Sequence, residues 1–298
     1  MGWDLCTEFP RANEILEAAS ELCGFPLKQY CLRGPEEMLT RTDVLQPALT
    51  AINLACIELL REHGQTPDAV AGHSLGELAA LYAADVLTLS DTLRLATARG
   101  RLMHRASQER PGGMIAVKNV SDTTIAEIVQ LAGRAYAISI ANFNAPGETV
   151  LSGETAGIEC AIRLITESGG RAIPLRVSGG WHSPLMQAIV PEFAAVVDGT
   201  QFATPTVPIY VNVTARPETH PAKLQELLVR QVTSPVRWRE IVELLAGHGI
   251  RTWLEVGPGK VLRGLLRRIL PKTEYVAHGI DKPRSVRQLA PEAERVTP

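Results

Sequence analysis

The feature that most constrains the fold is a short apolar run that leads into a Gly-x-Ser-x-Gly turn. Residues 68–71 (DAVA) are followed by GHSLG at 72–76 and then by an Ala- and Leu-rich stretch over 77–84. This order predicts a strand, a sharp turn and a helix. In such a nucleophile elbow, the two glycines allow a strained backbone that exposes the serine hydroxyl above a sheet. The pattern therefore favours an α/β fold with Ser74 as a candidate nucleophile.

The motif also has a simpler interpretation, because G-x-S-x-G occurs by chance in ordinary tight turns. The predicted strand before it and the predicted helix after it favour the elbow. In an elbow the backbone N–H of Leu75 lies at the helix N-terminus and points to where an oxyanion would form. We therefore expect Leu75 to supply an oxyanion-stabilising donor.

A serine nucleophile needs a base within hydrogen-bond reach, and His182 is the best candidate among seven histidines. It stands in SGGWHSP at 178–184, directly after an extended run. The glycines there permit close approach to another segment, and Trp181 suggests a lined pocket. A packed loop histidine is the alternative. His73 adjoins Ser74 on the other side of the elbow, so we expect it to support the site.

Arg99 falls on the apolar stripe of a helix predicted over 91–106, together with Leu95, Leu102 and Ala106. An inward guanidinium is costly unless a carboxylate pairs with it. That carboxylate could belong to the protein or to a substrate, for which the planar fork is suited. The pattern alone leaves both possibilities open.

The segment from 112 to 177 has a pattern of predicted elements that differs from the rest of the chain. Its periodicity predicts strands, helices and strands in the order β-α-β-β-α-β, over 114–117, 121–131, 136–141, 149–151, 155–166 and 171–177. This order is typical of a ferredoxin-like split unit. We expect residues 111–177 to form an insert between two parts of a main body, 1–110 and 178–280.

The main body is predicted to alternate helices and strands. Helical periodicity runs from 10 to about 60, and after the insert come a buried strand at 207–213, helices at 238–245 and 260–270, and a strand at 252–256. Such alternation favours a parallel sheet covered on both faces. The tail at 281–298, rich in Pro, Arg and Glu, is expected to be a surface arm or disordered.

Composition argues against several classes of function. Lys and Arg number 30 against 32 Asp and Glu, a net charge of −2, so no global positive field attracts nucleic acid or an anionic membrane. Five cysteines without a C-x-x-C pair suggest neither a disulfide framework nor a metal site, and favour reduced cytoplasm. The N-terminus lacks the cationic region of a signal peptide, and no apolar run approaches transmembrane length, the longest candidate being 78–89.

Six segments of the chain, taken together, carry a specific family resemblance. They are GHSLGE at 72–77, RGRLM at 99–103, IANFNAPG at 140–147, HSPLM at 182–186, SPVRW at 234–238 and EVGPGKVL at 255–262. In this order, and over nearly the whole chain, they resemble the malonyl-CoA:acyl carrier protein transacylases and the acyltransferase domains of polyketide synthases.

The resemblance implies an α/β-hydrolase-like core with a ferredoxin-like insert, and it implies roles for residues. Ser74 would carry the acyl group as an ester, His182 would act as general base and then acid, and Arg99 would bind the malonyl carboxylate. The family orients its histidine with a backbone carbonyl, here that of Ser234. Two further positions are expected to support the site: Asn142, in the third segment, and Trp181, which stands where malonyl-specific members usually carry Phe.

The implied reaction is a ping-pong transfer. A malonyl thioester of coenzyme A would acylate Ser74, and the phosphopantetheine thiol of an acyl carrier protein would remove the acyl group. The resemblance implies a monomer, and it implies no permanently bound cofactor. One alternative is an acyl-thioester hydrolase, in which water replaces the carrier thiol. Family members begin with a strand and a G-Q-G-[SA]-Q loop that this sequence does not contain, so a second alternative is an inactive remnant or docking module without that oxyanion loop.

A basic cluster lies on and beside the helix predicted at 260–270, with no acid between its members along the sequence. Arg263 and Arg267 share a helix face at i and i+4. We expect this face to receive an acidic carrier protein. A solvated face with cations near the helix C-terminus is the alternative. The cluster comprises Lys260, Arg263, Arg267, Arg268 and Lys272.

Overall fold

The predicted elbow is present in the computed structural model, which describes residues 1–287 and 289. Strand β1 (Val70–Ala71) leads through the turn into helix α5 (Gly76–Ala83). Strand β1 pairs in parallel with β6 (Ile209–Tyr210), and β6 pairs antiparallel with β7 (Pro217–Glu218). Two longer strands, β8 (Thr252–Val256) and β9 (Val276–Ile280), form a second, parallel pair.

The expectation of one doubly covered parallel sheet is wrong within the described residues. The strands of the main body form two separate small sheets, and the strand expected at 207–213 is reduced to two residues. The cause lies at its end, because the backbone N–H of Asn212 donates to the carboxylate of Glu77 instead of to a strand. The N–H of Val211, one residue earlier, still donates to the carbonyl of Arg216, in register with the pairing of β6 and β7.

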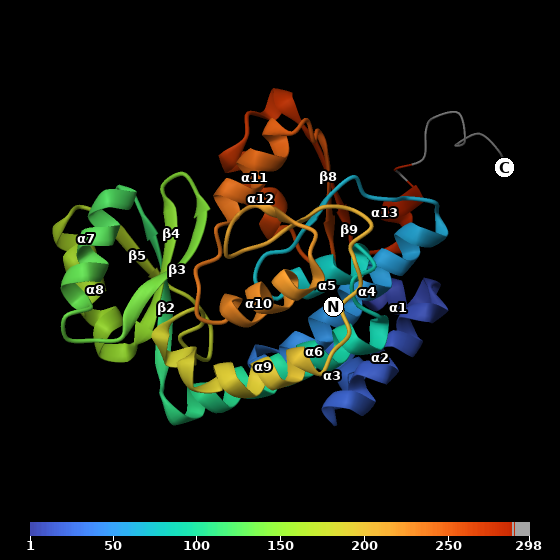
Figure 1. Cartoon of the computed structure of the whole chain (residues 1–298), viewed down its shortest axis with the longest axis horizontal. Coiled ribbons are helices and arrows are strands. Elements are labelled where there is room, and N and C mark those ends of the chain that lie inside the picture. The colour runs from blue at the N-terminus through green and yellow to red at the C-terminus, as the bar shows by residue number, and fades with distance from the viewer. Residues whose placement is uncertain (288, 290–298) are drawn as a thin grey trace.

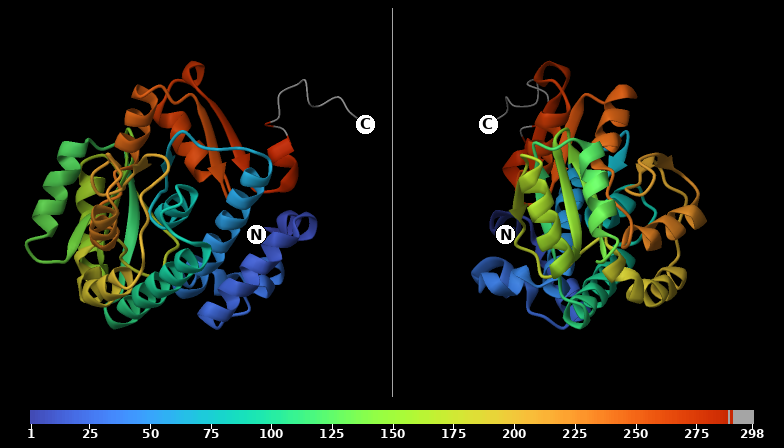
Figure 2. Two further views of the ribbon diagram at one scale, coloured as in Figure 1. Left: turned by 45° about the vertical axis from the view of Figure 1, so that its right-hand side comes forward. Right: turned by 90° about the vertical axis from the view of Figure 1, so that its left-hand side faces the viewer.

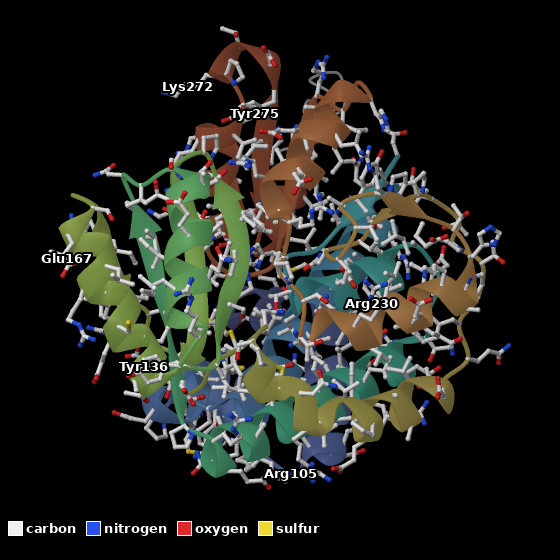
Figure 3. The ribbon with its side chains drawn as sticks, turned by 60° about the vertical axis from the view of Figure 1, so that its left-hand side comes forward. Arg105, Tyr136, Glu167, Arg230, Lys272 and Tyr275 are labelled. Atoms are coloured by element: carbon white, nitrogen blue, oxygen red, sulfur yellow. The ribbon has the colours of Figure 1, made fainter. Side chains whose placement is uncertain are left out.

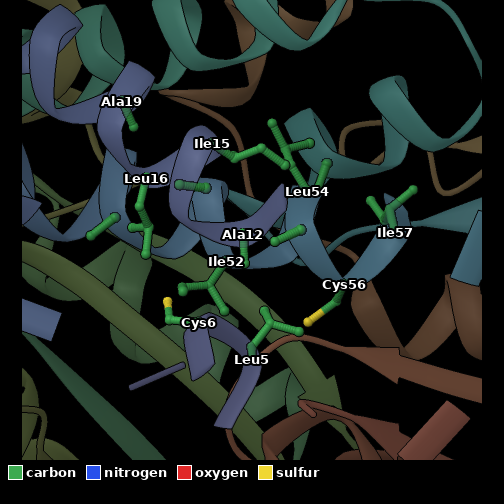
Figure 4. Packing of buried hydrophobic residues seen from close by; sticks show 14 of the residues in the cluster. Leu5, Cys6, Ala12, Ile15, Leu16, Ala19, Ile52, Leu54, Cys56 and Ile57 are labelled. Atoms are coloured by element: carbon green, nitrogen blue, oxygen red, sulfur yellow. The ribbon is translucent and has the colours of Figure 1, made fainter. Parts of the chain in front are cut away.

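The amino-terminal helices pack into one apolar cluster. Leu5 and Leu16, from α1 (Trp3–Glu8) and α2 (Pro10–Cys23), meet Ile52 of α4 (Thr42–Glu62) in its interior (Figure 4). Short helices α3 (Leu27–Arg33) and η1 (Glu36–Thr40) connect them, and α6 (Leu89–Glu109) lies alongside α4.

Helix α4 corrects the expectation about apolar runs. From the sequence, 78–89 is the longest candidate for a membrane-spanning run. Among the described residues, α4 is the helix that is long and apolar enough to cross a membrane, by length and composition alone. In the fold, 78% of its most apolar window is buried. Its apolar character is therefore accounted for by burial in the core, as in the central helix of a globular protein.

Residues 112–174 contain the six predicted elements in the predicted order. The strands are β2 (Gly112–Lys118), β3 (Ile138–Ala145), β4 (Glu148–Glu154) and β5 (Arg171–Pro174), and the helices are α7 (Asp122–Ala132) and α8 (Thr155–Glu167). All pairs in this sheet are antiparallel, in the order β3-β4-β2-β5. Figure 1 and Figure 2 show this unit on the side opposite the amino-terminal helices.

The remaining segments return the chain to the main body. The helices are η2 (Pro184–Ile189), α9 (Val190–Asp198), α10 (Pro221–Gln231), α11 (Trp238–Gly247), α12 (Val261–Ile269), η3 (Lys272–Glu274) and α13 (Pro283–Arg287). Strand β3 meets this part through a parallel bridge between Asn142 and Val236.

The expectation of a surface or disordered tail over 281–298 is wrong for its first part. Residues 283–287 form α13, and Val286 is buried in the amino-terminal cluster, where an apolar side chain gains by leaving water. Residues 288 and 290–298 lie outside the described residues.

Candidate active site

The serine turn is strained, and one glycine explains how it is made. Ser74 has a φ of 50°, a conformation that non-glycine residues rarely adopt. At Gly72, a Cβ atom would lie 2.0 Å from the carbonyl carbon of Gly76, so no larger residue fits. A Cβ at Gly76 would meet nothing within 4 Å, so the expectation that both glycines are needed holds only for Gly72.

The side chain of Asn212 holds this turn at two points. Its Oδ1 accepts the backbone N–H of Ser74 at 2.7 Å, and its Nδ2 donates to the carbonyl of Gly72 at 2.6 Å. Asn212 is completely buried, so water does not compete for these bonds. A single amide thus fixes both sides of the strained serine.

His182 lies against the serine with its ring nitrogens in distinct environments. Its Nε2 is 2.6 Å from Oγ of Ser74, whereas its Nδ1 faces the carbonyl oxygens of Gln231 at 2.8 Å and Ser234 at 3.1 Å. Because carbonyls only accept, the proton of a neutral ring belongs on Nδ1, and the lone pair of Nε2 faces the serine. Burial, with the nearby charge of Arg99, lowers the pKa of His182 to about 3. The ring is therefore neutral near pH 7 and able to accept a proton.

Arg99 is buried beside the serine and has neutral partners. It donates to Oε1 of Gln46 at 2.8 Å, to Oε1 of Gln231 at 3.0 Å and to Oγ of Ser74 at 3.2 Å. No carboxylate of the described residues lies within 4.0 Å of it, and its Nε has no partner there. Burial lowers the pKa of Arg99 to about 10, so it stays charged at pH 7. Of the two partners left open by the sequence, a fixed carboxylate is not found at ion-pair distance.

Gln231 connects all three of these residues, and sequence reasoning missed it. Its backbone carbonyl accepts from His182, its Oε1 accepts from Arg99, and its Nε2 donates to the carbonyl of Ser74 at 3.0 Å. It ends helix α10, and no sequence signal marked it. Gln46, on α4, gave no signal either.

Glu77 and Asn212 were also missed, although the sequence held a signal for both. Glu77 is the only charged residue of the Ala- and Leu-rich stretch 77–84, and Asn212 interrupts the apolar run IYVNV at 209–213. A polar residue at a position predicted to be buried needs a partner. The carboxyl of Glu77 accepts from the backbone N–H of Asn212 at 2.7 Å, whereas the side chain of Asn212 finds its partners in the serine turn. Burial raises the pKa of Glu77 to about 7.

The supporting residues expected from the sequence lie close by in different ways. The backbone N–H of Leu75, the residue before α5, has no acceptor among the described residues. His73 contacts Oδ1 of Asn144 through Nε2 at 2.9 Å, and its ring lies edge-on to Trp238. Burial lowers the pKa of His73. The asparagine in contact with His73 is thus Asn144, whereas Asn142 is buried in β3 beside Val236.

Trp181 lies between the insert and the main body. It packs against buried residues of β2, β3 and β4 as well as against the core beside α6. Ser107 and Trp181 both crowd Gly179, where a Cβ would come within 2.5 Å of the indole. The ring therefore adjoins the segment that carries His182.

The basic cluster differs from expectation, because acids from other parts of the fold pair with it. Arg263 donates to Glu255 through Nε at 2.9 Å, and Arg268 forms a forked pair with Glu148 of β4. Arg267 is exposed and has no ion-pair partner among residues 1–287 and 289. Lys272 lies at an outer corner of the molecule in Figure 3. No acid lies between these cations along the sequence, but Glu255 and Glu148, from outside that stretch, pair with Arg263 and Arg268.

The cysteines and the potential metal ligands of the described residues do not gather into a further site. Its five cysteines are free, and no group of three or more His, Cys, Asp or Glu side chains in it could hold a metal ion.

Comparison with known proteins places this geometry among acyltransferases. The model of the family described as acyl transferase domain matches residues 1–295. A malonyl CoA-acyl carrier protein transacylase of Haemophilus influenzae is 39% identical over 277 residues, 92% of this chain and 89% of the relative.

Solved structures give the same result. The crystal structure of malonyl-CoA:acyl carrier protein transacylase from Xanthomonas oryzae is 37% identical, with a TM-score of 0.92 over 97% of this chain and 92% of that one. A malonyl-transacylase in complex with its type II PKS acyl-carrier protein is 35% identical, with a TM-score of 0.90 over 96% and 92%. The chain thus has the mixed helix-and-sheet α/β structure of malonyltransferases.

Proposed function

Because the chain belongs to the acyl transferase domain family, we propose that it transfers a malonyl group from coenzyme A to the phosphopantetheine thiol of an acyl carrier protein. The observation that carries the proposal is a buried cation, Arg99, within hydrogen-bond distance of a serine that contacts a neutral histidine. A cation without a carboxylate partner suits a substrate that brings its own carboxylate. The relative from Haemophilus influenzae and the solved carrier-protein complex support this substrate and partner.

In the first half-reaction, Nε2 of His182 takes the proton of Ser74 as Oγ attacks the thioester carbonyl. The carbonyl oxygen becomes an oxyanion, which the free N–H of Leu75 stabilises. When the C–S bond breaks, the imidazolium returns its proton to the leaving coenzyme A thiolate. The malonyl group is then an ester of Ser74, and its carboxylate is bound by Arg99.

The second half-reaction runs the same steps with a different thiol. The neutral ring of His182 takes the proton of the phosphopantetheine thiol, whose sulfur attacks the seryl ester. The C–O bond breaks, and the proton on Nε2 passes to Oγ of Ser74. The carbonyls of Ser234 and Gln231 keep the ring in the required tautomer throughout, in place of a triad acid.

The supporting residues have lesser tasks in this proposal. His73 holds the segment of Asn144 next to the elbow, and Asn142 stands in the same strand, β3. Trp181 reshapes the pocket floor and so affects which acyl group fits. Arg267, Lys260 and Lys272 are the members of the basic cluster that are exposed and have no ion-pair partner among the described residues, so they remain available for an acidic carrier protein.

We propose that the main body, residues 1–110 and 178–280, is α/β-hydrolase-like in its strand–turn–helix around Ser74 and in the parallel pairing of β1 with β6, although its strands form two small sheets, and that residues 111–177 are a ferredoxin-like unit. The order β3-β4-β2-β5 with two helices supports the second part, since it is the strand order of a split β-α-β unit. We propose a cytoplasmic monomer that works without a permanently bound cofactor. The five cysteines, which form no disulfide among the described residues, support a reducing compartment.

The experiment is a partition assay. The protein is incubated with malonyl-CoA and a phosphopantetheine-bearing carrier protein, and malonyl carrier and free malonate are both measured. The proposal predicts carrier malonylation in large excess over hydrolysis, and none with the carrier that lacks phosphopantetheine. Malonate as the main product would instead show an acyl-thioester hydrolase, and no turnover together with no seryl adduct would show an inactive remnant.

A further inference from the structure

Glu77 is a buried carboxyl to which the mechanism above gives no task. It lies in the first turn of α5, three residues after Ser74, and is 1% exposed. Burying a carboxyl is costly, so its place needs a reason. The charge of Arg99 and the side-chain amide of Gln231 both act to lower the pKa of this carboxyl, but burial outweighs them and raises it to about 7. Its oxygen Oε2 accepts from a backbone donor, the N–H of Asn212, at 2.7 Å.

Asn212 leads from this carboxyl to the reactive serine. Its backbone is bound to Glu77, and its side chain is bound to the carbonyl of Gly72 and the N–H of Ser74. Asn212 lies beyond the end of β6, and its backbone is held at two points: its N–H donates to Glu77, and its carbonyl accepts from the N–H of Arg237 at 3.2 Å. The carboxyl of Glu77 is therefore the side-chain group that helps to fix where the amide of Asn212 can reach.

The serine turn keeps its strained conformation only while neighbouring groups restrain it. A non-glycine residue with a φ of 50° relaxes unless its surroundings over-determine it. The bond from Ser74 N–H to Asn212 is such a restraint, and the Oγ of Ser74 must stay 2.6 Å from His182 for proton transfer. A shift at Glu77 would reach Oγ through two hydrogen bonds.

We propose that Glu77 is a positioning residue that acts through Asn212 to hold Ser74 in its attacking geometry. The proposal rests on the proposed function only in taking Ser74 as the nucleophile. It names no contact between Glu77 and a substrate, so its effect should appear in the reactivity of the serine with any electrophile. That property separates it from a role in malonyl recognition.

The test is a double-mutant cycle read with two reagents. Glu77→Met fills similar space without an acceptor, Asn212→Ala removes the amide, and the third variant combines both. The rate of Ser74 labelling is measured with a fluorophosphonate, which needs no malonyl recognition, and with malonyl-CoA. Each single variant should slow fluorophosphonate labelling roughly 10²-fold, and the double variant should be no more than about threefold slower than the slower single.

Two further variants separate positioning from stability and from charge. Glu77→Gln keeps an oxygen that can accept from Asn212 N–H, so labelling should stay within about threefold of the parent. Glu58→Met is the matched control for Glu77→Met, because Glu58, on α4, accepts at 2.6 Å from the hydroxyl of Tyr82, which lies at the end of α5 away from the serine. It should lower the melting temperature without slowing the labelling.

The outcomes are distinguishable. The proposal would be overturned if the labelling rate of the double variant fell by the product of the two single-variant losses. It would also be overturned if a folded Glu77→Met protein labelled at the same rate as the parent. Glu77→Gln as slow as Glu77→Met would assign the effect to charge instead of position. If thermal melts show that Glu77→Met does not fold, the cycle is run with Glu77→Ala. A parent that labels with fluorophosphonate but not with malonyl-CoA would refute the proposed function and leave this cycle interpretable.

Discussion

Replacing Arg99 by Met should change substrate choice far more than stability. The guanidinium is 2% exposed, and its partners are the neutral oxygens of Gln46, Gln231 and Ser74. A charge-assisted hydrogen bond contributes about 1.5–3 kcal/mol. One or two such bonds to a buried malonyl carboxylate would contribute about 3 kcal/mol, which corresponds to roughly 10²-fold in rate.

Two opposing changes determine the effect of Arg99→Met on stability. Burial lowers the pKa of Arg99 to about 10 from 12.5, so the folded protein bears a cost for keeping this group charged, and Met removes that cost. The buried Oε1 atoms of Gln46 and Gln231, however, each lose a donor. We therefore expect the melting temperature of Arg99→Met to stay close to that of the parent.

The assay compares kcat/KM for acylation of Ser74 by malonyl-CoA and by acetyl-CoA. Arg99→Met should reduce the malonyl-to-acetyl ratio by about 10²-fold. Arg101→Met, at an exposed position of the same helix, is the control and should leave the ratio unchanged. An equal fall for both substrates would refute the reasoning, because it would mean that Arg99 only holds Gln46 and Gln231 in place.

Three other predictions concern the base, the carrier surface and pH. His182→Ala should slow acylation about 10²–10⁴-fold in a rapid-quench assay, and a loss below tenfold would assign the base elsewhere. Arg267→Glu should raise KM for an acidic carrier protein at low salt but not for a small pantetheine thiol, and equal effects on both would contradict docking there. The pKa of Glu77 is raised from 4.5 to about 7, so the unfolded chain ionises first and the free energy of unfolding should fall as pH rises through 4.5–7. The pKa of His182 is lowered from 6.5 to about 3, so that free energy should fall as pH falls from 6.5 toward 3. Denaturant titrations at several pH values, with Glu77→Gln and His182→Gln lacking the respective slopes, test both signs.

Local signals in the sequence located the reactive groups. The elbow could be predicted because its strand, turn and helix are adjacent in the chain, and Gly72 is required by a contact only four residues away. Arg99 could be singled out because a cation on an apolar helical stripe conflicts with its own surroundings. His182 could be singled out by the glycines beside it. Each of these signals lies within one turn or one helix.

The groups that hold the site could not be predicted in the same way, because folding brings them from distant segments. Gln231 reaches Arg99 across 132 residues, and Asn212 reaches Ser74 across 138. The same lack of long-range information explains the errors. Glu148, 120 residues from Arg268, pairs with a cation that has no acid near it in the helix sequence, and the strand at 209–210 ends early where a backbone donor turns to Glu77.

The measurement that tests the central claim most directly is the site of the acyl group. The protein is mixed with malonyl-CoA, and intact mass followed by peptide mapping locates any adduct. We predict one malonyl group, on Ser74, absent from Ser74→Ala and lost when a phosphopantetheine-bearing carrier protein is added. A malonyl adduct of equal yield on Ser74→Ala would contradict the account, because the nucleophile would then be a residue outside the elbow.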